Sequence, residues 1–215
     1  MPRRTLLRPA PAAWTRSELA ALRRLRTPAR IQDFLDALSY RTEDAPACPR
    51  RVLAERTAHC YDGALFAAAA LRLAGHPPLL VDLQAVRDDD HVLAVFREGG
   101  CWGAIAKSNF AGLRFREPIF RSVRELATSY FESYFNLEGE KTLRRYLRPF
   151  DLSRFDRLGW TFDETWLPDI AERLDASRHH PVLPPARERR LRAVDDRSMR
   201  SGMVGTDLAG VHRNG

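Results

Sequence analysis

The most apolar stretch of the chain has the pattern of a buried helix. Between Cys60 and Ala74 only Asp62 and Arg72 are charged, and a helix that is apolar nearly all round is buried on every side. Gly75 follows at the position where a helix ends, and two prolines shortly after it prevent continuation. We therefore expect a buried central helix that begins at Cys60.

Strand patterns follow this helix. Residues 79–86 and 91–96 are rich in Val and Leu, and residues 101–106 return after a glycine-containing turn. These three segments predict an antiparallel sheet. Elsewhere in the chain, the pattern predicts one more strand at residues 113–116. It also predicts helices at residues 17–25, 28–38, 122–135, 141–147 and 164–175.

The turn between the second and third strands leaves two registers open. A two-residue Gly99-Gly100 loop brings Ser108 opposite His91, whereas a four-residue loop brings Ala106 opposite it. Both registers place residues 106–109 beside His91.

The thiol at the start of the helix has surroundings that favour a reactive thiolate. A helix N-terminus offers unpaired N–H groups and partial positive charge, and both lower a thiol pKa. Asp62, in the same first turn, partly opposes this effect. The alternative is that Cys60 is a small buried hydrophobic residue. Its place at the helix start and the histidine downstream favour a nucleophile.

His91 opens a strand and is the predicted general base. A third group should orient its ring from the neighbouring segment. We predict Asn109, because its side-chain oxygen can accept the imidazole N–H, with Ser108 as the second choice.

Residues near these positions are predicted to bind substrate. Tyr61 and Trp102 are expected to line the cleft, and Lys107 is expected to attract a substrate carboxylate unless it is simply an exposed cation; Ser108 belongs to the same set. His59 binds substrate, competes with His91 as the base, or caps the helix. Backbone N–H groups at the start of the Cys60 helix are the expected oxyanion donors.

These motifs resemble the transglutaminase-like superfamily, a branch of the papain-like cysteine-enzyme fold. The resemblance covers roughly residues 50–110 and rests on Cys60 with its helix, His91 opening a strand, and the strand that carries Trp102. It implies an α+β fold in which the helix bearing the cysteine packs on an antiparallel sheet. Members of the superfamily are cysteine peptidases, deamidases, cross-linking acyltransferases or inactive relatives, so the resemblance implies a protein or peptide-like amide substrate.

The stretch after the third strand resembles a bacterial branch of that superfamily and departs from its commoner pattern. The branch has a Lys-Ser-Asn stretch like residues 107–109, whereas many other members have an aspartate near this point. Residues 105–107 contain no carboxylate. With Asn109 in the third role, the predicted site is Cys–His–Asn, as in papain-type enzymes.

The length of 215 residues suits one domain with appendages. We expect an N-terminal helical segment at 1–40, a core with C-terminal helices at 41–178, and a basic, flexible tail at 179–215. The arginine-rich first 30 residues resemble a mitochondrial presequence in composition, but a short surface helix with Ser17 as N-cap is the preferred interpretation.

The cysteine count and the hydropathy pattern bear on location. Three cysteines form no even disulfide framework, which favours a reducing, cytoplasmic location. The longest apolar run, residues 64–71, is too short to span a bilayer, so no membrane partner is expected. The sequence does not define an oligomeric state.

The net charge of +7 raises nucleic-acid binding as a rival function. The sequence has no helix-turn-helix pattern, zinc-finger spacing or RNP-type aromatic strand, so specific nucleic-acid recognition is not expected. Zinc ligation by His59, Cys60 and His91 is disfavoured, because adjacent residues at a helix start do not easily point at one ion. We expect no metal and no cofactor.

Overall fold

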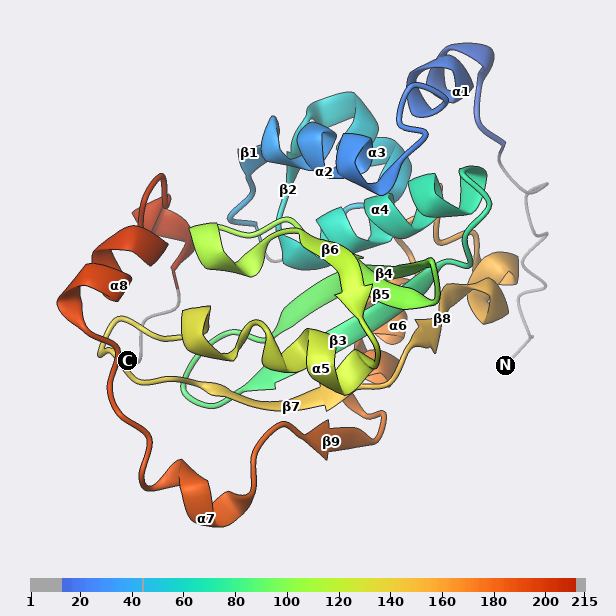
Figure 1. Cartoon of the computed structure of the whole chain (residues 1–215). Helices are drawn as coiled ribbons and strands as arrows, with labels where there is room; N and C mark the ends of the chain where they lie inside the picture. The colour runs from blue at the N-terminus through green and yellow to red at the C-terminus, as the bar shows by residue number, and fades with distance from the viewer. Residues whose placement is uncertain (1–12, 44, 212–215) are drawn as a thin grey trace, which may run out of the picture.

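The computed structural model describes residues 13–43 and 45–211. These residues form a mixed α/β fold around a seven-stranded sheet in which all neighbouring strands are antiparallel (Figure 1). The order across the sheet is β6 (Arg116–Phe120), β5 (Cys101–Ile105), β4 (His91–Glu98), β3 (Leu79–Ala85), β7 (Leu143–Leu147) and β9 (His179–Pro181), with β8 (Phe150–Asp151) also on β3. The expected α+β class with an antiparallel sheet is therefore confirmed.

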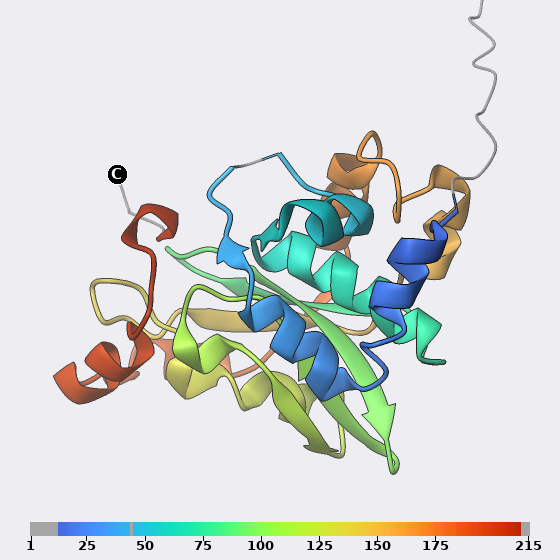
Figure 2. The ribbon, with the colours of Figure 1, turned by 90° about the horizontal axis from the view of Figure 1, so that it is seen from above.

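Helices cover both faces of the sheet. One face packs against α4 (Cys60–Leu73) together with α2 (Pro28–Asp36), α3 (Pro49–Glu55) and α6 (Leu167–Asp175). Figure 2 shows the N-terminal helices lying across the sheet. The other face packs against α5 (Val123–Thr128) and the 3₁₀ turn η2 (Phe131–Ser133).

Alternation along the strands divides the core between these two layers. On β4, Val92, Ala94 and Phe96 belong to the core on the α4 side, whereas Leu93 and Val95 belong to the core on the α5 side. Because successive side chains of a strand point to opposite faces, His91 has the same orientation as Leu93.

The remaining elements are short. They are α1 (Arg16–Leu22), the parallel pair β1 (Ser39–Tyr40) and β2 (Thr57–Ala58), η1 (Ala111–Leu113), η3 (Leu152–Leu158), α7 (Pro185–Glu188), α8 (Asp196–Gly202) and η4 (Leu208–Gly210). No helix in the described part of the chain is long and apolar enough to cross a membrane.

The central helix is confirmed. Helix α4 begins at Cys60, and every residue from Tyr61 to Leu71 is buried. Gly75, just beyond its end, has φ of 95°, a left-handed conformation that glycine adopts readily. Fully burying Leu65, Phe66 and Leu71 contributes about 1.5–3 kcal/mol each.

The hairpin has the two-residue loop. Glu98 pairs with Cys101 and Ala94 with Ile105, and both loop glycines have positive φ, as a tight hairpin turn requires. Strand β5 ends at Ile105, so the ladder stops before it reaches His91. This leaves space at the end of the sheet.

Several local predictions were wrong. Residues 143–147 form a strand rather than a helix, and both faces of that strand are largely buried, so no alternating pattern marks it. The helix expected at 122–135 ends at Thr128, and residues 111–113 form a 3₁₀ turn before β6 begins at Arg116. The first helix is capped by Thr15 instead of Ser17. Of the first 30 residues, where a presequence was considered, residues 1–12 lie outside the described residues.

The start of the expected tail, residues 179–182, joins the sheet and the core instead of extending into solvent. His179–Pro181 forms β9 on the edge of the sheet, and Val182 is buried. The polar composition of this segment concealed its docking, because main-chain pairing with β7 needs no apolar side chains. Near its end the chain returns to Tyr40, where Gly210 packs against the tyrosine ring.

Candidate functional site

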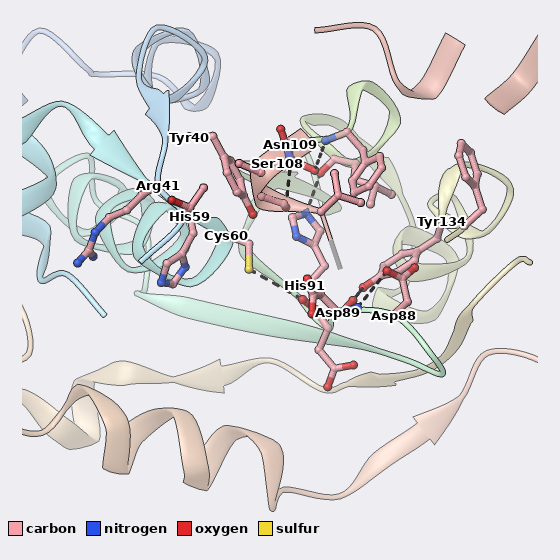
Figure 3. A pocket seen from close by; sticks show the side chains of 18 of the residues that line it. Tyr40, Arg41, His59, Cys60, Asp88, Asp89, His91, Ser108, Asn109 and Tyr134 are labelled. Atoms are coloured by element: carbon pink, nitrogen blue, oxygen red, sulfur yellow. Dashed lines mark hydrogen bonds between the residues drawn. The ribbon is translucent and has the colours of Figure 1, made fainter. Parts of the chain in front are cut away.

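A cavity of about 450 Å³ lies where α4 and β4 both begin (Figure 3). It contains both residues predicted to carry the chemistry, Cys60 and His91. Its lining mixes polar and apolar side chains and is formed by Tyr40, Arg41, Thr42, Glu43, His59, Cys60, Asp88, Asp89, Asp90, His91, Ser108, Asn109, Phe110, Leu113, Tyr134, Phe135, Ala209, Gly210 and Val211.

The start of α4 is fixed by a capping box. His59 is the N-cap, and its Nδ1 accepts a hydrogen bond from the Tyr61 N–H at 3.2 Å. Asp62 returns a bond to the His59 main chain and is fully buried. It also binds Arg41 at 3.1 Å and accepts a bond from the Ala47 N–H at 2.7 Å. The capping interpretation of His59 is thus confirmed, and the helix that carries Cys60 is tied to residues 41–47.

The Cys60 thiol is protonated in this environment. Its sulfur lies 3.9 Å from the carbonyl oxygen of Asp90, to which the S–H donates. Burial raises the pKa of Cys60 to about 12, and the nearby charges of Asp82 and Asp62 act in the same direction. The N–H groups of Val92 and Tyr61 lower the pKa, but burial outweighs them.

His91 is neutral and has a defined tautomer. Its Nε2 lies 2.8 Å from the carbonyl oxygen of Leu113. A carbonyl can only accept, so Nε2 carries the hydrogen and Nδ1 keeps its lone pair. Burial lowers the pKa of His91 to about 4, with a smaller opposite effect from the Leu113 hydrogen bond. The ring also meets Tyr134 edge-on, with 6.5 Å between ring centroids.

Asn109 does not orient His91, and its predicted role was wrong. Its side-chain nitrogen donates to the carbonyl oxygens of Asp207 at 2.7 Å and Gly210 at 3.1 Å. Its side-chain oxygen accepts a bond from the Asp207 N–H at 2.8 Å. The Leu113 carbonyl occupies the position predicted for it. Asn109 instead fastens residues 206–211, called the clip below, beside the pocket.

Three of the residues predicted to bind substrate lie elsewhere. Lys107 is buried, and its Nζ donates to the carbonyl oxygens of Leu35 at 3.0 Å and Leu38 at 2.5 Å. Tyr61 is buried, with its hydroxyl on the Leu167 carbonyl at 3.1 Å. Trp102 lies near the turn of the hairpin, where the Arg97 guanidinium stacks over it. All three stabilise the fold rather than line the cavity.

Ser108 and His59 line the cavity, and their role in binding substrate stays a prediction. Sequence analysis missed Tyr40, Tyr134, the acidic run Asp88–Asp90 and the clip. The acidic run directly precedes His91 in the sequence, so its proximity to the site could have been predicted. Tyr134 is buried, and its hydroxyl donates to the Asp89 carbonyl oxygen at 2.6 Å.

Comparison with protein-family models found no family that matches the chain, and comparison with curated proteins found no relative.

Proposed function

We propose that this protein catalyses thiol-dependent acyl transfer or amide hydrolysis, with Cys60 as nucleophile and His91 as general base. The observation that supports it best is the state of His91. Its Nε2 hydrogen is fixed on the Leu113 carbonyl, so the basic Nδ1 remains available in a cavity shared with the thiol. A neutral base beside a protonated thiol is the starting state for general-base activation.

The reaction proceeds through a thioester. The Cys60 proton passes to His91 Nδ1 as the sulfur attacks the carbonyl carbon of an amide. The C–N bond then breaks, and the amine leaves with the proton from His91. Water or a second amine attacks the thioester, giving its proton to His91 and restoring the thiol. The first-turn N–H groups of α4 are the proposed oxyanion donors.

The α4 helix on an antiparallel sheet supports a papain-like or transglutaminase-like core for this site. The helix start carries the cysteine, and the next strand but one opens with the histidine. In this version of the site a main-chain carbonyl holds the imidazole. A carbonyl fixes the ring and its tautomer but stabilises the imidazolium less than a carboxylate does.

Incubation with a glutamine-containing peptide and hydroxylamine tests the proposal. We expect hydroxamate formation if an amine acceptor is used, or ammonia release without hydroxylamine if water is used. Cys60→Ala should abolish both, and His91→Gln should lower the rate by about 10²–10⁴. Cys101→Ser is the matched control, because Cys101 lies at the hairpin turn away from the cavity. A peptide library extends the test to hydrolysis of main-chain amides.

A second candidate function is ligand binding without catalysis. It is favoured by the resting protonation states, because burial raises the pKa of the thiol and lowers that of the imidazole. If no acyl-enzyme forms with any peptide, but a peptide binds and Tyr40→Ala weakens that binding, the cavity is a recognition site. Tyr40 lines the cavity and takes no part in the proposed proton transfers.

A further inference from the structure

Three carboxylates gather beneath the Cys60 pocket, on the α4 side of the sheet. They come from separate elements: Asp82 from β3, Asp90 from the turn before β4, and Asp175 from the end of α6. One carboxylate oxygen of each lies within 4.8 Å of the others. Asp82 is 1% exposed, whereas Asp90 and Asp175 are exposed to solvent.

Asp82 has an unused acceptor. Its Oδ2 accepts a hydrogen bond from His179 Nε2 at 2.8 Å, but its Oδ1 is buried and has no hydrogen-bond partner among residues 13–43 and 45–211. A buried acceptor without a partner is costly, especially on a charged group. The unpartnered oxygen belongs to the carboxylate that points into the cluster.

His179 fixes the orientation of the Asp82 carboxylate. Its Nδ1 lies 2.7 Å from the Ser177 carbonyl oxygen, and its Nε2 lies 2.8 Å from Asp82 Oδ2. The imidazole ring is thus held between a main-chain acceptor and one oxygen of the carboxylate, while the other oxygen, Oδ1, is left for a ligand.

We propose that Asp82, Asp90 and Asp175 form a binding site for a hard divalent cation, preferentially Ca²⁺. Oxygens on opposite sides of a Ca²⁺ ion lie up to about 5 Å apart, because Ca–O bonds are about 2.3–2.6 Å long, whereas Mg²⁺ requires shorter bonds. His179 holds the Asp82 carboxylate in place, as outer-shell partners of metal ligands do. Water supplies the remaining ligands.

The site is accessible from two sides. Asp90 lines the Cys60 cavity, and Asp175 lines a second cavity of about 380 Å³ with His59 and Pro168. Asp90 also joins the cation site to the thiol, because its side chain belongs to the cluster while its carbonyl oxygen accepts the Cys60 S–H. A bound ion would therefore hold the turn that contacts the thiol. The inference does not depend on Cys60 acting as a nucleophile.

Calorimetric titration of the full chain with CaCl₂, after removal of metals with EDTA, tests the site. We expect one bound Ca²⁺ per chain and weaker binding of Mg²⁺. At a Ca²⁺ concentration a hundredfold above Kd, the Tm should rise by about 5–10 °C.

Asp175→Asn should weaken Ca²⁺ binding by at least about tenfold, since ligand charge sets affinity. Asp175 is exposed, so this variant should fold, and it is preferred to a change at the buried Asp82. Asp169→Asn, on the same helix and outside the cluster, is the matched control and should keep the original affinity. If Ca²⁺, Mg²⁺ and Mn²⁺ produce neither heat nor a Tm shift, the proposal is overturned. The partner of Asp82 Oδ1 would then be a water molecule. Equal binding by Asp175→Asn and wild type would also overturn it.

Discussion

At the scale of single residues, the decisive contact is the hydrogen bond between His91 and the Leu113 carbonyl. It fixes which imidazole nitrogen is basic without adding a charge to the site. His91 is 5% exposed, so its protonation in the folded state would place an imidazolium in a buried environment with a neutral partner. That environment has a measurable consequence for stability.

The stability of the wild-type protein should fall more steeply in acid than that of His91→Gln. Burial lowers the pKa of His91 from 6.5 to about 4. Between these values the unfolded chain binds a proton that the folded chain does not, so stability falls as pH decreases from 6.5 to 4. The free energy of unfolding that wild type loses through His91 between pH 6.5 and pH 4 is about 3 kcal/mol. Urea unfolding at pH 7 and pH 4 measures it, and parallel pH dependences for the two proteins would contradict the assignment.

Sequence patterns predicted some of these residues and not others. Cys60 and the capping role of His59 follow from position at the start of an apolar helix, which is local information. The partner of His91 is a main-chain carbonyl, and every residue has one, so no side-chain pattern could have identified Leu113. Asn109 was selected for its chemistry, but its bonds go to Asp207 and Gly210, about a hundred residues along the chain.

At the scale of elements, the packing of α4 depends on a glycine near its start. A Cβ placed on Gly63 would lie 2.4 Å from the Cβ of Lys107 and 3.5 Å from its Cα. Lys107 cannot easily move, because its Nζ is bound to two carbonyl groups at the end of α2. The glycine therefore allows the helix that carries Cys60 to approach the segment that follows β5.

Gly63→Ala should destabilise the protein although alanine favours helices. The helix-propensity gain is about 1 kcal/mol, while overpacking costs about 1–3 kcal/mol and here involves atoms next to the main chain. We expect a net loss of about 1 kcal/mol and a Tm decrease of about 2–4 °C. Thermal unfolding followed by circular dichroism measures it. A higher Tm would show that the Lys107 segment yields readily.

Elements with a strong local signal were predictable. The apolar run and the glycine stop defined α4. The Gly99-Gly100 turn located the hairpin but left two registers open, and the pairing of Glu98 with Cys101 selects one of them. Strand β7 was assigned as a helix, because Leu143, Tyr146 and Leu147 have helical spacing. Its edges pair with β3 and β9, and its side chains enter the core on both sides of the sheet, Leu147 on one side and Leu143 and Tyr146 on the other. This tertiary environment overrides the local pattern.

At the scale of the whole molecule, residues 179–182 are part of the fold. Strand β9 extends the sheet, and the His179 side chain, 3% exposed, pairs with the buried Asp82. Removing it would leave an unpaired carboxylate in the core. This changes what truncation is expected to do.

Truncation after Arg178 should destabilise the protein strongly. Loss of one partner from a buried ion pair costs about 3–5 kcal/mol, which corresponds to a Tm decrease of about 10 °C in a chain of this size. The single variant His179→Ala separates the ion pair from the strand, and it should produce most of the loss. A Tm unchanged by truncation would show that β9 and its histidine do not contribute to stability.

The clip is expected to limit the access of solvent to the Cys60 thiol. Residues 209–211 line the Cys60 cavity, and Asn109 holds the clip by three hydrogen bonds to Asp207 and Gly210. Ending the chain after Gly205, or changing Asn109 to Ala, should expose the thiol to water. Because burial raises the pKa of Cys60, exposure should lower it, and each unit of decrease gives about tenfold more thiolate at neutral pH.

Iodoacetamide labelling of Cys60, followed by peptide mass spectrometry at pH 7.5, should therefore be faster in both variants than in wild type. Labelling of Cys101 provides an internal control, since it lies outside the cavity. The direction of the effect distinguishes two roles of Asn109. An asparagine that oriented His91 would activate the thiol, and its loss would slow labelling. An asparagine that fastens the clip shields the thiol, and its loss accelerates labelling. Slower labelling in Asn109→Ala, with unchanged labelling after truncation, would reject the clip as a barrier to the site.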